Sequence, residues 1–199
     1  MATAAPVRQS RASRTEDAIL QATRELLSES GVRELTVEKV AARSGVAKTT
    51  IYRRWRSKED LALAVLIDFV RTITAVPRSD DVRDELVAVL KAAITSLGTT
   101  AMGSIMQGLV SELATNDELS QRFRDQVVAL RVSEVRRVVE RGIERGELRP
   151  DIDVELLHEL MFGPVYYRLL LTGRPLERKF AGQVVDAVLA AFREPSDQY

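Results

Sequence analysis

The residues best suited to a chemical role lie between positions 36 and 58, in the stretch TVEKVAARSGVAKTTIYRRWRSK. Lysine and arginine pair with phosphates, arginine can donate two hydrogen bonds to the edge of one guanine, and hydroxyl groups bond to phosphate oxygens. One short segment combines all of these side-chain types: Lys48, Thr49, Thr50, Tyr52, Arg53 and Arg54. Such a combination is typical of a surface that meets nucleic acid.

Two short amphipathic helices joined by a tight turn are expected to position this segment. Gly45 can adopt a positive φ without steric cost, which lets two helices meet at a steep angle across three or four residues. The apolar residues on either side of it fall at helical spacing and are expected to face inward: Val37, Val40, Ala41, Val46, Ile51 and Trp55. The pattern predicts a helix-turn-helix, whose second helix enters the DNA major groove.

The expected contacts divide into two kinds, because phosphate contacts position a protein on DNA and base contacts specify the sequence. We expect base edges to be read by Thr49, Thr50 and one or both of Arg53 and Arg54. We expect phosphates to be met by Thr36, Lys48, Tyr52 and Lys58. The alternative for each residue is an ordinary solvated helix surface.

The charge distribution supports a nucleic-acid contact near the N-terminus. The whole chain is neutral, with 29 basic and 29 acidic residues. Residues 1–58 hold 12 Lys and Arg against 6 Asp and Glu, whereas residues 59–199 hold 17 against 23. A basic end on an acidic body is expected where one small domain meets phosphates and the rest stays away from them.

Composition excludes sites that depend on cysteine and gives no sign of a membrane-spanning or secretory segment. The chain has no cysteine, so disulfides, thiolate metal sites and cysteine nucleophiles are excluded. No run of about 18 apolar residues predicts a membrane span, and no signal-peptide pattern begins the chain. We therefore expect a cytoplasmic protein that makes no membrane contact, with no catalytic residues, no bound metal and no cofactor.

The remaining pattern is helical throughout and predicts an all-α protein of about nine helices. We expect a disordered basic arm at 1–12, a helix-turn-helix DNA-binding domain at 13–57 and a helical effector-binding and dimerisation domain at 58–199. Capping boxes are predicted to open helices at Ser13 and Thr115, and Pro77 is predicted to end the helix that begins after Ser57.

The N-terminal third resembles the tetracycline-repressor (TetR) family. The segment TVEKVAARSGVAKTTIYRRWRSKEDL follows that family's pattern at Thr36, Val37, Ala41, Gly45, Val46, Lys48, Tyr52, Trp55, Ser57, Lys58, Glu59 and Leu61. Thr49 replaces a glycine that is common in the family, and Arg53 and Arg54 are more basic than usual. These differences are expected to alter the choice of operator.

The resemblance implies a ligand-responsive transcriptional regulator, most often a repressor, that binds a palindromic operator in double-stranded DNA as a homodimer. It implies that the last two helices pack against their symmetry mates, and Leu169, Val184, Val188 and Phe192 are expected to form that seam. The alternative is that these four residues complete the core of one chain.

Between the DNA-binding and dimer helices we expect a pocket for an unknown small-molecule effector, largely apolar because few charges interrupt the inner faces. Its candidate lining residues are Phe69, Met102, Met106, Phe123, Phe162 and Tyr166. Ordinary core packing is the alternative for each of them.

Two other classes of function are weighed against this one. A helical-bundle enzyme is suggested by Glu155 and His158, whose spacing occurs in di-iron bundles. The chain has one histidine, however, so one subunit cannot complete that set of ligands, and His158 is expected to be a partly exposed helical residue. An architectural DNA-binding protein without an effector would be basic overall, which the acidic body opposes.

Overall fold

The computed structural model describes residues 11–72 and 78–192, and these residues are helical with no β-strand. The elements are α1 (Arg11–Glu34), α2 (Val37–Ser44), α3 (Lys48–Tyr52), α4 (Lys58–Thr72), α5 (Val82–Thr99), α6 (Ala101–Thr115), α7 (Asp117–Phe123), η1 (Arg124–Val128), α8 (Ala129–Glu144), α9 (Val154–Tyr167), η2 (Arg168–Thr172) and α10 (Arg178–Phe192). The π-helical segments η1 and η2 continue their neighbours without a break, so the described ranges form nine helices. The first of these, α1, is kinked at Gly31, which has a φ of 70°. The all-α prediction is confirmed.

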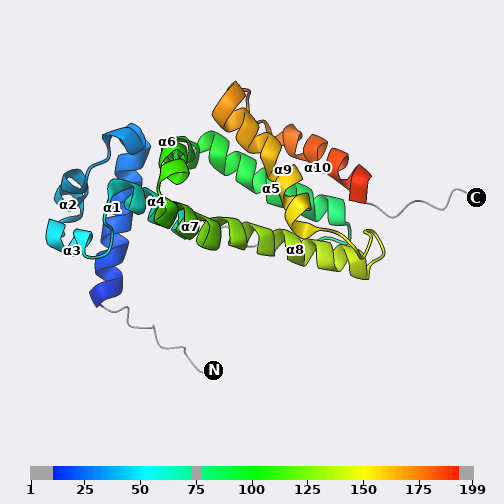
Figure 1. Ribbon diagram of the computed structural model, residues 1–199, viewed down its shortest axis with the longest axis horizontal. Helices are drawn as coiled ribbons and strands as arrows, with labels where there is room; N and C mark the ends of the chain where they lie inside the picture. Colours follow the sequence, from blue (N-terminus) through cyan, green and yellow to red (C-terminus); the bar gives the residue numbers. More distant parts are fainter. Residues whose placement is uncertain (1–10, 73–77, 193–199) are drawn as a thin grey trace, which may run out of the picture.

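The helices are arranged along one long axis (Figure 1). Helices α1, α2 and α3 lie at one end, and α5, α8, α9 and α10 form a bundle at the other. Helices α4, α6 and α7 lie between the two groups.

Most helix ends follow the capping signals in the sequence. The Thr36 hydroxyl oxygen accepts a hydrogen bond from the Lys39 N–H at the start of α2. Ser57 accepts from the Asp60 N–H at the start of α4, and Asp81 caps α5. These side chains satisfy backbone donors that would otherwise lack a partner in the first helical turn.

Both predicted capping boxes are wrong by a few residues. Helix α1 is already helical at Arg11, because arginine and alanine are good helix formers and extend the first turn upstream of Ser13. Arg11 and Ala12 are thus helical, whereas the rest of the expected disordered arm lies outside the described residues. At the second box, Thr115 is the last residue of α6, and Asn116 caps α7 by accepting from the Leu119 N–H. Pro77 lies outside the described residues.

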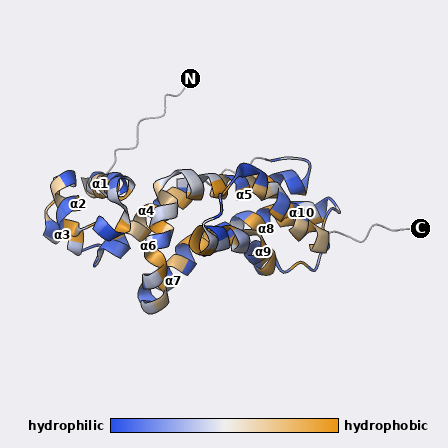
Figure 2. Cartoon of the chain, turned by 90° about the horizontal axis from the view of Figure 1, so that it is seen from above, coloured by the Kyte–Doolittle hydropathy of each residue, from blue (hydrophilic) through white to orange (hydrophobic). Residues whose placement is uncertain are grey.

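Two apolar clusters form the core, and the first crosses the expected domain boundary at 57/58. It joins α1–α3 to buried residues of α4 and α6, together with Leu119 and Val127. The second joins α5, α8, α9 and α10. Figure 2 shows hydrophobic residues gathered where α4 and α6 meet. Seven of the fifteen residues of α4 are buried, so this helix is enclosed on most of its circumference.

Helix α6 approaches α1 closely at Gly108. A Cβ atom at this position would lie 2.7 Å from the Cβ atom of Val32, which is shorter than a normal contact between carbon atoms. Val32 is itself buried in the first cluster. The absence of a side chain at Gly108 therefore sets the distance between the N-terminal helices and the central ones.

One helix pair meets the length and composition expected of a membrane span. No single described helix is long and apolar enough to cross a membrane; α5 and α6 meet the criterion only when taken together, and they are bent by 83° at their junction.

We predict that Gly108→Ala lowers the free energy of unfolding by about 1–3 kcal/mol, because the new methyl group overpacks the contact with Val32. Chemical denaturation measures the change. Gly182→Ala is the matched control: its Cβ atom would meet only the Arg83 guanidinium at 3.6 Å, and alanine favours the helix. Equal stability of the two variants would show that α1 and α6 are not tightly packed here.

Candidate functional site

The outward surface of α3 is held in place by a local apolar core beneath it. Gly45 ends α2 with φ of 69°, and its N–H donates to the Ala41 carbonyl. Ile51 and Trp55 are buried, and so are Val37 and Val40 of α2. The predicted helix-turn-helix is present, with its apolar residues inside and its basic side outside.

The predicted base-contacting residues do reach the surface. Lys48, Thr49, Arg53 and Arg54 are exposed, and Thr50 is half-buried. Tyr52 is 47% exposed, so this large aromatic residue lies on the surface of the molecule. We refer to the exposed side chains of residues 48–54 as the α3 ridge.

Acidic neighbours already pair with two of the cations on the α3 ridge. Lys48 Nζ lies 3.0 Å from Glu38 Oε1. This hydrogen bond lowers the pKa of Glu38, and so does the hydrogen bond from the backbone of Glu38 to its own carboxylate. An Arg54 amino group lies 2.8 Å from Glu16, and the guanidinium also lies over the Trp55 ring. The Arg53 side chain has no ion pair or hydrogen bond with any residue in 11–72 or 78–192. Among the cations of the α3 ridge, Arg53 is therefore the one that can contact a base without first breaking an ion pair.

The two predicted phosphate contacts at the edges of the module differ in position. Thr36 is exposed at the N-terminus of α2, where backbone N–H groups and the helix dipole favour an anion. Lys58 is half-buried, and its ammonium group donates to the Arg33 carbonyl at 3.0 Å. A phosphate contact by Lys58 would have to replace or share that bond.

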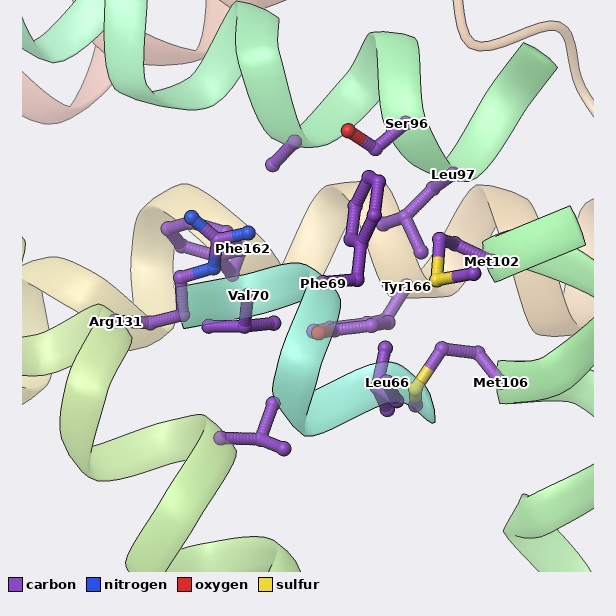
Figure 3. A pocket seen from close by; sticks show the side chains of 12 residues that line it. Leu66, Phe69, Val70, Ser96, Leu97, Met102, Met106, Arg131, Phe162 and Tyr166 are labelled. Atoms are coloured by element: carbon purple, nitrogen blue, oxygen red, sulfur yellow. The ribbon is translucent and has the colours of Figure 1, made fainter. Parts of the chain in front are cut away.

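A cavity lies between α4, α5, α6, η1, α8 and α9 (Figure 3). Five of the six expected pocket residues line it: Phe69, Met102, Met106, Phe162 and Tyr166. Phe123 does not; it packs, half-buried, against the first apolar cluster. Tyr167, another aromatic residue of α9, is 58% exposed and points away from the core.

The cavity is small in this conformation. Its volume is about 30 Å³, which is roughly the space of a single water molecule. Pockets that enclose drug-sized molecules measure about 300–1,000 Å³. A ligand of that size must displace side chains, and the two methionines among the lining residues are flexible enough to move.

The expectation that few charges interrupt the inner faces is confirmed at the cavity wall, where Arg131 is the one ionic residue among the twelve that line it. Arg131 lines the cavity with only 9% of its surface exposed, and it donates to Glu134, whose side chain is 2% exposed. Sequence spacing could have shown this, because Arg131 lies four residues from both Val127 and Val135 and therefore on their buried face.

His158 is also buried rather than partly exposed as predicted. Its ring stacks on Phe162 with centroids 4.5 Å apart, and burial lowers its pKa, as does the nearby charge of Arg131. No group of three or more potential metal ligands of the His, Cys, Asp or Glu type occurs in the part of the chain that the structure describes.

The expected dimer seam is wrong in its residues. Val184, Val188 and Phe192 are buried against the second apolar cluster, and Leu169 is half-buried against the first, so they complete the core of one chain. Helix α9 and η2 instead expose a different set of large apolar side chains: Leu156, Leu160, Tyr167 and Leu171. We refer to these four residues as the α9 stripe.

Comparison with known proteins covers almost the whole chain. Residues 19–65 match the family described as bacterial regulatory proteins, tetR family, and residues 76–188 match the tetracyclin repressor-like C-terminal domain. An uncharacterized HTH-type transcriptional regulator, YdeS of Bacillus subtilis (strain 168), is 32% identical over 90% of this chain and 88% of its own length.

Two solved structures extend the comparison to the fold. The TetR family transcription regulator SCO0332 shares 34% identity and a TM-score of 0.78, covering 89% of this chain and 97% of the other. FadR from Bacillus subtilis in complex with stearoyl-CoA has a TM-score of 0.70 at 20% identity, covering 88% of this chain and 98% of the other, a likeness in fold.

We predict that Arg53→Ala weakens binding to the preferred DNA sequence by about 1–3 kcal/mol and relaxes the preference at one base pair, because an arginine–guanine contact is lost. Competition binding with single-base variants of the site measures both effects. Arg54→Ala is the matched control, since Arg54 is paired with Glu16, and it should change the base preference less. Equal weakening of Arg53→Ala on all sequences would show that Arg53 contacts only the DNA backbone.

Proposed function

The chain belongs to the tetR family of bacterial regulatory proteins and is a DNA-binding transcriptional regulator, and we propose that it binds a palindromic operator as a homodimer and releases it when a small molecule enters the cavity. Proteins of this family are typically ligand-responsive repressors, so repression relieved by the ligand is the proposed direction.

The observation that carries operator recognition is the α3 ridge above a buried local core. Ile51 and Trp55 anchor the helix from below, so the exposed side chains are presented on a rigid support. Thr49, Thr50 and Arg53 are proposed to read base edges, and Arg54 contributes where its bond to Glu16 is exchanged. Thr36, Lys48, Tyr52 and Lys58 are proposed to bind phosphates.

Release by a ligand is proposed because α4 belongs to both regions of the molecule. At its N-terminal end, Leu61 packs in the core shared with α1–α3. At its C-terminal end, Leu66, Phe69 and Val70 line the cavity. We propose that a ligand that enlarges the cavity displaces this end of α4, and that the helix carries the displacement toward the DNA-binding unit. The coupling between two such sites is typically 1–3 kcal/mol.

A homodimer is proposed because one helix-turn-helix reads too few bases for selectivity, and a two-fold dimer reads two half-sites about 34 Å apart or a multiple of that distance. The α9 stripe supports the last two helices as the interface. Leu171 is 74% exposed, and Leu156 and Leu160 lie one turn apart on the same face of α9. Such a row of large apolar side chains marks a surface that another protein surface covers.

Selection of bound fragments from a pool of random duplex DNA tests the proposal. The expected product is a two-fold symmetric sequence whose half-sites are spaced for a dimer. Binding with steep salt dependence and no preferred sequence would instead indicate an architectural DNA-binding protein.

We predict that Leu160→Glu converts the dimer to a monomer and abolishes high-affinity operator binding, because a charge would be buried at the interface. Sedimentation and a DNA mobility shift measure the two effects. Val110→Glu is the matched control, since Val110 is similarly exposed on α6 but lies outside the α9 stripe. A dimeric Leu160→Glu protein would show that the chains associate through another surface.

A further inference from the structure

The cavity wall contains one charged side chain, and a carboxylate outside the cavity lining already neutralises its charge. Among the cavity-lining residues only Arg131 is ionic. Its Nη1 donates to Glu134 Oε2 at 2.9 Å, and this is the one hydrogen bond that its side chain makes with a described residue. Glu134 is not itself part of the lining. A molecule in the cavity therefore meets a guanidinium that has unused donors and belongs to an ion pair without net charge.

The groups around the ion pair do not alter this balance. His158 is held in its neutral form because burial, and the charge of Arg131, lower its pKa. Glu155, the other charge that acts on His158, is exposed to solvent and paired with Arg136. The buried cluster of Arg131, Glu134 and His158 thus has a net charge near zero.

A second hydrogen-bond donor shares the cavity wall. Tyr166 makes no side-chain hydrogen bond with any described residue. Burial raises its pKa, so the phenol stays protonated and can donate. Figure 3 shows its hydroxyl directed toward Val70, on the side of the cavity where Arg131 lies. Two unused donors, Arg131 and Tyr166, therefore lie among otherwise mainly apolar residues.

Polar atoms beside the cavity are also left without partners. Glu134 Oε1 and His158 Nε2 are buried and have no hydrogen-bond partner among the described residues. Burying a polar group without a hydrogen-bond partner is unfavourable, and more so if the group is charged. The cluster therefore has hydrogen-bonding capacity that the protein alone does not use.

From this arrangement we infer that the effector is a neutral molecule with an apolar body and a single oxygen acceptor, such as a hydroxyl or carboxamide, that accepts hydrogen bonds from Arg131 and Tyr166. This inference rests on the proposed function of the cavity. A carboxylate is disfavoured because Glu134 already balances Arg131, so an incoming anion would bury an unbalanced negative charge. A pure hydrocarbon would fill the apolar space but leave both donors unused.

Four probes with one common body test the inference: 4-phenylbutanol, 4-phenylbutyramide, 4-phenylbutyrate and butylbenzene. Affinity is measured by calorimetry on the full-length protein without DNA. The alcohol and the amide are expected to bind about tenfold more tightly than butylbenzene, because a hydrogen bond to a charged donor is worth at least that factor. They are also expected to bind about tenfold more tightly than 4-phenylbutyrate.

Two nearly isosteric variants probe the charge balance at Arg131 and the Tyr166 donor separately. Glu134→Gln removes the balancing charge, so the preference should reverse in favour of 4-phenylbutyrate. Tyr166→Phe removes only a hydroxyl, so alcohol and amide binding should weaken severalfold while butylbenzene binding stays unchanged. Tyr166→Phe keeps the test decisive if Glu134→Gln does not fold.

The inference is overturned if the native protein prefers 4-phenylbutyrate, if butylbenzene equals the alcohol, or if no probe binds. Operator binding measured on the same samples separates this failure from that of the proposed function. A protein that binds its operator but none of the probes retains its role as a regulator and loses the inferred effector class. A protein that binds the alcohol but no operator would retain the effector class and lose the proposed function.

Discussion

The enclosure of α4 is the constraint on which the rest of the molecule depends. Most of its circumference is buried, and the helices packed around it belong to the DNA-binding end and to the effector end alike. Protein interiors are packed as densely as organic crystals, so a helix in this position cannot move without moving its neighbours. The cavity of about 30 Å³ lies against this helix. A change in the volume of the cavity therefore requires the helices around it to shift as well.

Surface ion pairs accompany this packing without replacing it. Arg122 pairs with Asp60 at the start of α4, and Arg56 pairs with Glu118 on α7. The second pair is largely exposed, and exposed pairs contribute roughly 0–1 kcal/mol each. Arg122 and Asp60 are less exposed and help to hold α7 against the N-terminal turn of α4. The apolar cluster supplies the stiffness, and these pairs fix how the helices align within it.

Features that depend on a few neighbouring residues could be predicted from the sequence. The cap at Thr36, the left-handed Gly45 and the exposed side of α3 each follow from spacing within about ten residues. The buried face of α10 could also be identified, but not which helices would cover it. Val184 and Val188 are covered within the same chain, and the large apolar residues left exposed belong to α9. Periodicity indicates that a face is apolar, whereas only tertiary packing determines its partner.

The buried Arg131–Glu134 pair is difficult to explain by stability alone. Two apolar side chains of similar volume would often be as stabilising or more so, because both charges lose their hydration on burial. The pair also leaves Glu134 Oε1 without a partner among the described residues. The position of the pair suggests a role in ligand binding, because it places guanidinium donors that are otherwise unused at a cavity with mainly apolar walls. The guanidinium donors that stay unused in the empty protein can be satisfied by a polar oxygen of a ligand. A ligand that binds them in one conformation and not in another gains the differential affinity that any shift between two conformations requires.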